Sequence, residues 1–189
     1  MNQGSFWIRV ASAGTAFGLL AAIAALAVDG YANPVASRDG IAATLRVGTF
    51  DSRAVAVAFT ASKMFREELE QWEKERREAE ARGDVAALER IEARAKQRQK
   101  LAHHQGFGTA SVEEILRRVG GRLPEIADKA GVDMIVSKWA ITYRSSDVEV
   151  VDVTDLLVEP FEPNQRTRRV IEQLREKSPI PHATIELQH

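Results

Sequence analysis

The stretch that decides the fold is residues 66–80, REELEQWEKERREAE, which is almost saturated with charge. Residues 53–82 around it contain neither Gly nor Pro, and residues of high helix propensity dominate them. In three pairs a Glu precedes a basic residue by four positions, an order that stabilises a helix: Glu70/Lys74, Glu73/Arg77 and Glu78/Arg82. The sequence therefore predicts one continuous, largely solvated helix over residues 53–82.

The apolar residues of this helix form a narrow seam. Phe65, Leu69, Trp72 and Ala79 follow steps of four and three, interrupted by Arg76, as at the a and d positions of a coiled coil. A seam this thin can bury little surface. We therefore expect the helix to pair with one partner and to leave its remaining faces in solvent.

A second helix follows directly. Gly83 suits the left-handed conformation after a helix end, and Asp84 suits the cap of the next helix. Residues 85–102 then carry a second thin apolar stripe, formed by Leu88, Ile91 and Ala95. The pattern predicts an antiparallel helical hairpin over about residues 53–103, with its tip at residues 82–84, that projects from the body of the protein.

Short strands and further helices flank this hairpin. Leu45 to Asp51 alternates as a strand, and Asp51 or Ser52 can cap the helix that follows. After the hairpin, residues 103–108 (HHQGFG) predict an interruption, and Ser111 with Glu114 predicts a capping box. The remaining expected elements are a helix over residues 112–130 and strands at residues 132–137, 140–143 and 148–153. The predicted fold class is α+β, mostly helical, with a small β body and a long projecting hairpin.

The N-terminal residues indicate export. Residues 10–28 carry no charge and follow Arg9, which is the layout of a bacterial secretory signal within residues 1–32. An uncleaved anchor is the alternative, because about 19 uncharged residues can span a bilayer. The weakly hydrophobic Ala residues of this run favour cleavage. Both alternatives predict a periplasmic location, the second with an inner-membrane tether through residues 10–28.

Two segments complete the predicted organisation. Residues 33–44 contain Pro, Ala, Ser, Asp and Gly in no periodic order and indicate a flexible leader. Residues 159–189 form a C-terminal extension with a helix at about residues 164–177. We assign no function to this extension from sequence.

The last part of the central region is a closing block with a recognisable order. It consists of ILRRV (115–119), IADKAGVDMIV (126–136), AITYRSSD (140–147) and VDVTDL (151–156). Together with the export signal, the strand-to-helix stretch VGTFDSR (47–53) and the charged hairpin, this block resembles the Skp/OmpH family of periplasmic chaperones. The resemblance covers residues 45–158.

The resemblance implies a homotrimer in which strands of three subunits form a small barrel and three hairpins surround a cavity. Such proteins hold unfolded outer-membrane proteins without ATP and without a cofactor. The apolar hairpin residues would then offer many weak contacts to a client: Met64, Phe65, Leu69, Trp72, Val85, Leu88 and Ile91. The alternative role of these residues is to seal the hairpin itself.

A different function class stays open beside the chaperone. A structural or adaptor protein, tethered by an uncleaved N-terminus, would use the same hairpin to engage a specific envelope partner. Charge separates this chain from the Skp/OmpH relatives, which are strongly basic and attract acidic clients and anionic lipid. This chain contains 26 Lys and Arg and 27 Asp and Glu, so its formal net charge is -1.

Composition and spacing argue against other functions. The chain has no Cys, which excludes disulfides, thiolate catalysis and Cys-based metal sites. The basic cluster at residues 90–100 lacks interleaved aromatic residues and is offset by Glu, so we expect no nucleic-acid partner. His103 and His104 have no third ligand at a metal-binding spacing. Asp51 and Asp133 complete no recognisable catalytic arrangement with them, and the sequence therefore predicts a protein that is not an enzyme.

Overall fold

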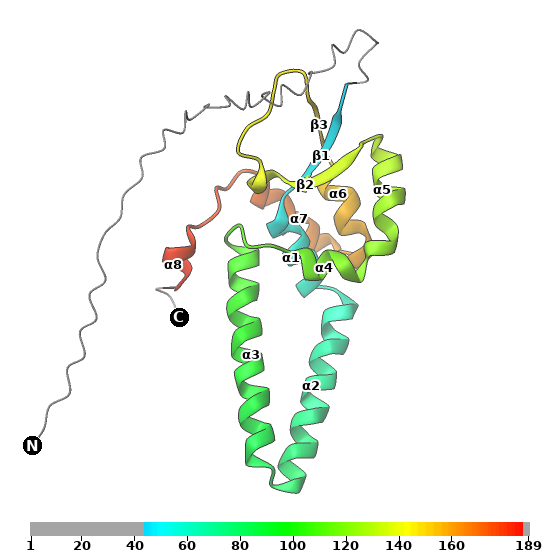
Figure 1. Cartoon of the computed structure of the whole chain (residues 1–189). Coiled ribbons are helices and arrows are strands. Elements are labelled where there is room, and N and C mark those ends of the chain that lie inside the picture. Colours follow the sequence, from blue (N-terminus) through cyan, green and yellow to red (C-terminus); the bar gives the residue numbers. More distant parts are fainter. Residues whose placement is uncertain (1–43, 187–189) are drawn as a thin grey trace, which may run out of the picture. The chain divides into compact units, whose positions relative to one another are not determined.

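Three parallel strands form the sheet of this protein. In the computed structural model, which describes residues 44–186, they lie in the order β2-β1-β3. Their bounds are β1 (Arg46–Phe50), β2 (Met134–Ser137) and β3 (Glu149–Asp152). Because all three strands run in one direction, their carboxyl ends lie together, and we call this end of the sheet its carboxyl edge. Helix α1 begins there (Figure 1).

Helices make up most of the remaining chain. They are α1 (Ser52–Thr60), α2 (Lys63–Arg82), α3 (Val85–Gly106), α4 (Glu113–Arg118), α5 (Leu123–Ala130), α6 (Thr154–Val158), α7 (Gln165–Arg175) and α8 (His182–Glu186). The described residues also contain three short 3-10 helices: η1 (Gly120–Arg122), η2 (Lys138–Ala140) and η3 (Glu159–Phe161). The fold is mostly helical with a small sheet, which confirms the predicted α+β class.

The first predicted helix is in fact two helices. The prediction of one helix over residues 53–82 is wrong, because α1 ends at Thr60 and α2 begins at Lys63. Ser62 makes the break: its hydroxyl donates to the carbonyl oxygen of Phe59 at 2.6 Å and accepts from the amide of Phe65 at 3.3 Å. A serine side chain that bonds to the backbone in this way competes with helical hydrogen bonds and caps a new helix.

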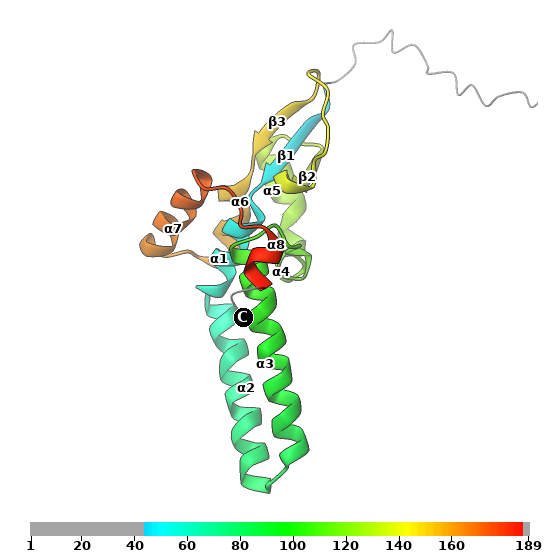
Figure 2. The same ribbon diagram turned by 90° about the vertical axis from the view of Figure 1, so that its left-hand side faces the viewer.

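The turn between α2 and α3 follows the prediction. Gly83 lies in the left-handed region with φ 64°, and the carboxylate of Asp84 accepts from the amide of Ala87 at 2.9 Å. The two helices lie side by side and extend away from the sheet in both views (Figures 1 and 2). We call α2 and α3 together the helix pair, with its tip at residues 83–84 and its base at the other end.

The end of α3 differs from the prediction. The helix continues through His103 and His104 to Gly106, so the interruption predicted over residues 103–108 is confirmed only for its last residues, from Phe107. It ends only at Phe107, whose amide still donates to the carbonyl oxygen of His103 at 2.9 Å. Two consecutive histidines do not break a helix when its last turn packs on neighbouring elements, and His104 is buried here.

The helix predicted over residues 112–130 is divided, and its capping box is not formed. The hydroxyl of Ser111 accepts from the amide of Glu113 at 3.2 Å, while the carboxylate of Glu114 accepts from the side-chain amide of Gln105 at 2.6 Å. The division falls at η1, which contains Gly120 and Gly121. Glycine weakens a helix interior because its backbone loses the most conformational freedom.

The strand predicted at residues 140–143 is absent from the structure. The chain leaves β2 at Ser137 and turns through η2, where the hydroxyl of Ser137 accepts from the amide of Trp139 at 3.4 Å. The strands predicted around β1, β2 and β3 are confirmed within one or two residues at each end.

The core forms where α1 packs against the helices around it. Phe59, Ile115 and Leu157 are completely buried there. The predicted C-terminal helix is confirmed as α7, which the side chain of Asn164 caps and which packs against α1. Its Ile171 belongs to the same core. Residues 159–186 therefore contribute to the body of the protein.

The signal or anchor expected in residues 1–32 and the leader expected in residues 33–44 lie outside the described residues, apart from residue 44. Among residues 44–186, no helix combines the length and the apolar character needed to cross a membrane.

Candidate functional site

An open apolar groove of about 820 Å³ runs along the helix pair. Its floor consists of apolar side chains from both helices: Phe65, Leu69 and Trp72 from α2, and Leu88, Ile91, Ala95 and Ala102 from α3. Charged and polar side chains make up much of the remaining lining: Glu73, Arg76, Glu80, Glu92, Arg98 and Gln99. We call this feature the helix-pair groove.

The predicted spacing explains how the helices build the groove. Side chains spaced by steps of three and four residues lie on one face of a helix, so each thin stripe forms one half of the groove floor. The α2 stripe and the α3 stripe therefore meet along the pair, and they leave Leu69 with 41% of its surface exposed. The two stripes thus close the helix pair and also leave apolar surface open to solvent.

The structure brings together five of the seven predicted client-binding residues. These five line the groove: Phe65, Leu69, Trp72, Leu88 and Ile91. Met64 and Val85 are exposed but do not line it. Met64 precedes Phe65 by one position and therefore points about 100° away around the helix, and Val85 opens α3 at the tip.

An arginine of the basic cluster at residues 90–100 closes the base of the groove, a role that its sequence pattern did not predict. The guanidinium of Arg98 lies 5.3 Å from the ring centroid of Phe59 and 5.6 Å from that of Phe65. The two rings contact each other edge to face, with centroids 5.3 Å apart. Arg98 also pairs with Glu114 at 3.5 Å. This cluster fixes the groove floor to the core, and its sequence signal is only the spacing of Arg98 from Leu88, Ile91 and Ala95.

A second arginine joins the two helices. The guanidinium of Arg94 lies 4.7 Å from the ring centroid of Trp72, and its Nη2 donates to the Glu75 carboxylate at 2.6 Å. The hydrogen bond from Arg94 lowers the pKa of Glu75. Because Arg94 comes from α3 and the other two residues come from α2, this contact holds the walls of the groove together.

The charges on the groove rim are paired with one another. Arg76 donates to Glu73 and to Glu80, each at 3.1 Å, and the hydrogen bond and charge of Glu73 are the main cause of its raised pKa. Glu92 pairs with Lys96 at 2.8 Å, which lowers the pKa of the carboxyl group. Each of these rim charges thus has a partner of opposite sign on the same helix.

Comparisons with known proteins add no relative to this description. The chain matches no family model, and no curated protein or solved structure matches it. The resemblance to the Skp/OmpH family therefore stays a prediction that rests on the order of residues in the sequence.

A second surface lies on the sheet. One face packs into the core through the paired row Ile135, Gly48 and Val151. The neighbouring row, Met134, Val47 and Val150, faces the other way and lines a shallow apolar hollow of about 470 Å³. The loop after η2 forms the other wall of this hollow, with Ile141 and Tyr143 among its residues. Tyr143 is 86% exposed and Met134 is 44% exposed.

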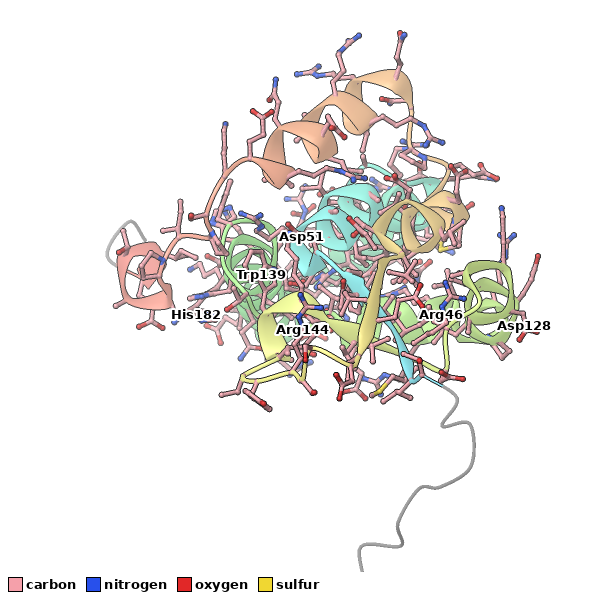
Figure 3. The ribbon with its side chains drawn as sticks, turned by 90° about the horizontal axis from the view of Figure 1, so that it is seen from above. Arg46, Asp51, Asp128, Trp139, Arg144 and His182 are labelled. Carbon is pink, nitrogen blue, oxygen red and sulfur yellow. The ribbon has the colours of Figure 1, made fainter. Side chains whose placement is uncertain are left out.

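The carboxyl edge of the sheet holds a buried ion cluster around Asp51 (Figure 3). Its carboxylate accepts from the Arg53 side chain at 2.7 and 3.0 Å and from the indole of Trp139 at 3.2 Å, and it pairs with Lys138 at 2.9 Å. Burial alone would raise the pKa of Asp51, but the hydrogen bonds from Arg53 and Lys138 outweigh burial and lower the pKa to about 2. Asp51 is therefore ionised, and three neighbouring side chains hold its carboxylate.

The other residues considered for chemistry have structural partners as well. Asp133 accepts from the backbone amide of Arg46 at 2.9 Å. The ring of His104 faces that of His182 on α8, with centroids 5.1 Å apart, and His103 contacts Phe107. Among residues 44–186, no group of three or more His, Asp or Glu is arranged to hold a metal ion.

Proposed function

We propose that this protein is an exported, ATP-independent holdase chaperone that binds unfolded outer-membrane or other envelope proteins. The observation that carries this proposal is the helix-pair groove, whose apolar floor is open to solvent between paired charges. A client segment would gain many weak apolar contacts along the floor, and no single contact would demand a particular sequence. The charged rim would keep the unloaded protein soluble.

The proposal includes a trimer whose sheets form a small barrel and whose helix pairs act as antiparallel hairpins around a cavity. Two properties of the sheet support it. Parallel sheets are usually covered on both faces, whereas the face that includes Met134 and Val150 lines an apolar hollow. Within residues 44–186, β2 and β3 each pair on one side only, and open edges invite further strands. Association of three copies would use both the edges and the hollow.

The test is protection of an unfolded outer-membrane barrel protein from aggregation by the mature chain. The groove variant Leu69→Gln/Ile91→Gln removes apolar floor, while the matched control Met64→Gln/Val85→Gln changes exposed apolar residues outside the groove. We expect several-fold weaker protection from the groove variant and unchanged protection from the control. Circular dichroism of both variants checks that α2 and α3 stay helical.

Two outcomes would sink the proposal. The first is a wild-type chain that gives no protection in this assay. The second is a groove variant that protects as well as the control while its helices remain intact. The solution mass of the mature chain tests the trimer separately, because a monomer at working concentration would contradict it even if protection were found.

A further inference from the structure

The helix-pair groove has an acidic end and a basic end. In the half next to the tip, residues 73–92, seven carboxylates outnumber five basic side chains. In the half next to the base, residues 63–72 and 93–106, six basic side chains outnumber three carboxylates. In the groove lining, the tip half carries three carboxylates and one basic side chain, Arg76. The base half carries Arg98, which pairs with Glu114 from α4.

This polarity decides which arrangement of two helix pairs is favourable. If two copies lay face to face in parallel, the acidic tips would meet and the basic bases would meet, which is repulsive in both places. If they lay antiparallel, each acidic tip would meet a basic base. A two-fold axis through the middle of the groove forms this attractive contact twice, and the two apolar floors would cover each other in a four-helix arrangement.

We propose that, when no client is bound, the groove is occupied by the helix pair of a second copy of this chain, docked antiparallel. This inference rests on the proposed function, since it assigns the regulation of the same groove: a client gains access by displacing the second copy. In the proposed trimer all helix pairs leave one barrel in the same direction. The antiparallel contact therefore joins two separate assemblies, and it stores the chaperone with its apolar floors covered.

Site-specific cross-linking tests the arrangement, because the natural chain contains no Cys. Glu80→Cys places a thiol near the tip end of the groove, and Gln99→Cys places one near the base end. The two full-length variants are mixed in equal amounts and mildly oxidised. We expect disulfide-linked dimers between the two different variants, few dimers within either variant, and loss of the mixed dimer when an unfolded barrel protein is added. Equal amounts of all three dimers, or no dimers, would overturn the inference.

Charge exchange gives a second test that does not depend on oxidation. Glu80→Lys/Glu92→Lys makes the tip basic, and Lys96→Glu/Lys100→Glu makes the base acidic. Each variant alone then opposes like charges in the antiparallel arrangement, while the mixture opposes unlike charges at both ends. We expect about tenfold weaker self-association of each variant than of wild type, with association regained in the mixture. Unchanged self-association of the single variants would refute the proposed orientation.

The cross-linking result and the protection assay test the pairing and the chaperone function separately. Mixed dimers without protection of a client would support the pairing and contradict the proposed chaperone function. Protection of a client without mixed dimers would support the proposed chaperone function and contradict the pairing.

Discussion

Arg53 donates to both carboxylate oxygens of Asp51, at 3.0 Å from Nε to Oδ1 and at 2.7 Å from Nη2 to Oδ2, although both side chains are almost completely buried. The same guanidinium also donates to the carbonyl oxygens of Leu174 and Lys177, each at 2.8 Å. One arginine therefore connects the carboxyl edge of the sheet to the end of α7. Neither a sequence motif nor the helical periodicity predicts this connection.

Replacing Arg53 should strongly destabilise the protein. In Arg53→Leu the buried carboxylate of Asp51 loses its bidentate partner, and two carbonyl groups at the end of α7 lose a donor. Breaking a buried ion pair on one side costs about 3–5 kcal/mol of unfolding free energy. Urea denaturation measures this loss. The control is Lys63→Ala, which removes an exposed pair with Glu67 and should change stability little. Equal, small effects of both substitutions would show that the buried pair is not a structural bond.

The stability of the protein should fall in acid partly because of Asp51. Its pKa is about 2 when folded and 3.8 in its ordinary range, so the folded state favours the ionised form. The stabilisation is present above pH 4 and is lost as the pH falls towards 2, by about 2 kcal/mol in total. Comparison with Asp51→Asn isolates this contribution, since other carboxylates titrate alike in both proteins.

The measurement is the difference in unfolding free energy between wild type and Asp51→Asn at several values of pH. We expect the difference to shrink between pH 5 and pH 2. A difference that stays constant over this range would mean that the carboxyl group titrates alike in the folded and unfolded chain, contrary to the buried cluster.

The C-terminal region should be part of the cooperative fold. Ile171 on α7 is 3% exposed and belongs to the core, whereas its neighbour Val170 is 39% exposed. Ile171→Ala should cost about 2–5 kcal/mol of unfolding free energy because it leaves a cavity. Val170→Ala should cost less than about 0.5 kcal/mol. Thermal or urea unfolding of both variants checks this pair, and similar values would indicate that α7 unfolds separately from the core.

Local signals in the sequence predicted the elements that depend on local chemistry. The turn at Gly83 and Asp84, the strand at β1 and the helix capped by Asn164 are all specified by a few adjacent residues. Periodicity also placed Phe65, Leu69 and Trp72 on one face, and the groove confirms that they lie together. These predictions succeeded because a turn, a cap or a stripe needs no knowledge of distant contacts.

The errors arose where distant contacts or competing hydrogen bonds decide the structure. Ser62 divides α1 from α2 through bonds to its own neighbours, a role that most serines in helical sequences do not take. The carboxylate of Glu114 does not form the expected capping box, because it accepts a hydrogen bond from Gln105, a residue of another helix. The site at the base of the groove depends on Arg98 and Phe59, which come from different elements and share no spacing that a sequence pattern could reveal.

The final prediction concerns the short helix α8, which the sequence did not indicate. Gly108 lies where the C-terminal segment crosses the end of α3, and a Cβ at this position would come within 2.8 Å of the His104 carbonyl oxygen and 3.0 Å of Ile185 Cδ1. Gly108→Ala should therefore push the buried side chain of Ile185 from its site, because the backbone on the other side cannot yield. The amide of Ile180, which donates to the Phe107 carbonyl at 2.8 Å, reports this displacement by faster hydrogen exchange. Gly106→Ala is the matched control, since a Cβ there meets nothing within 4 Å. If Ile180 exchanges equally slowly in both variants, the C-terminal segment does not depend on close approach at Gly108.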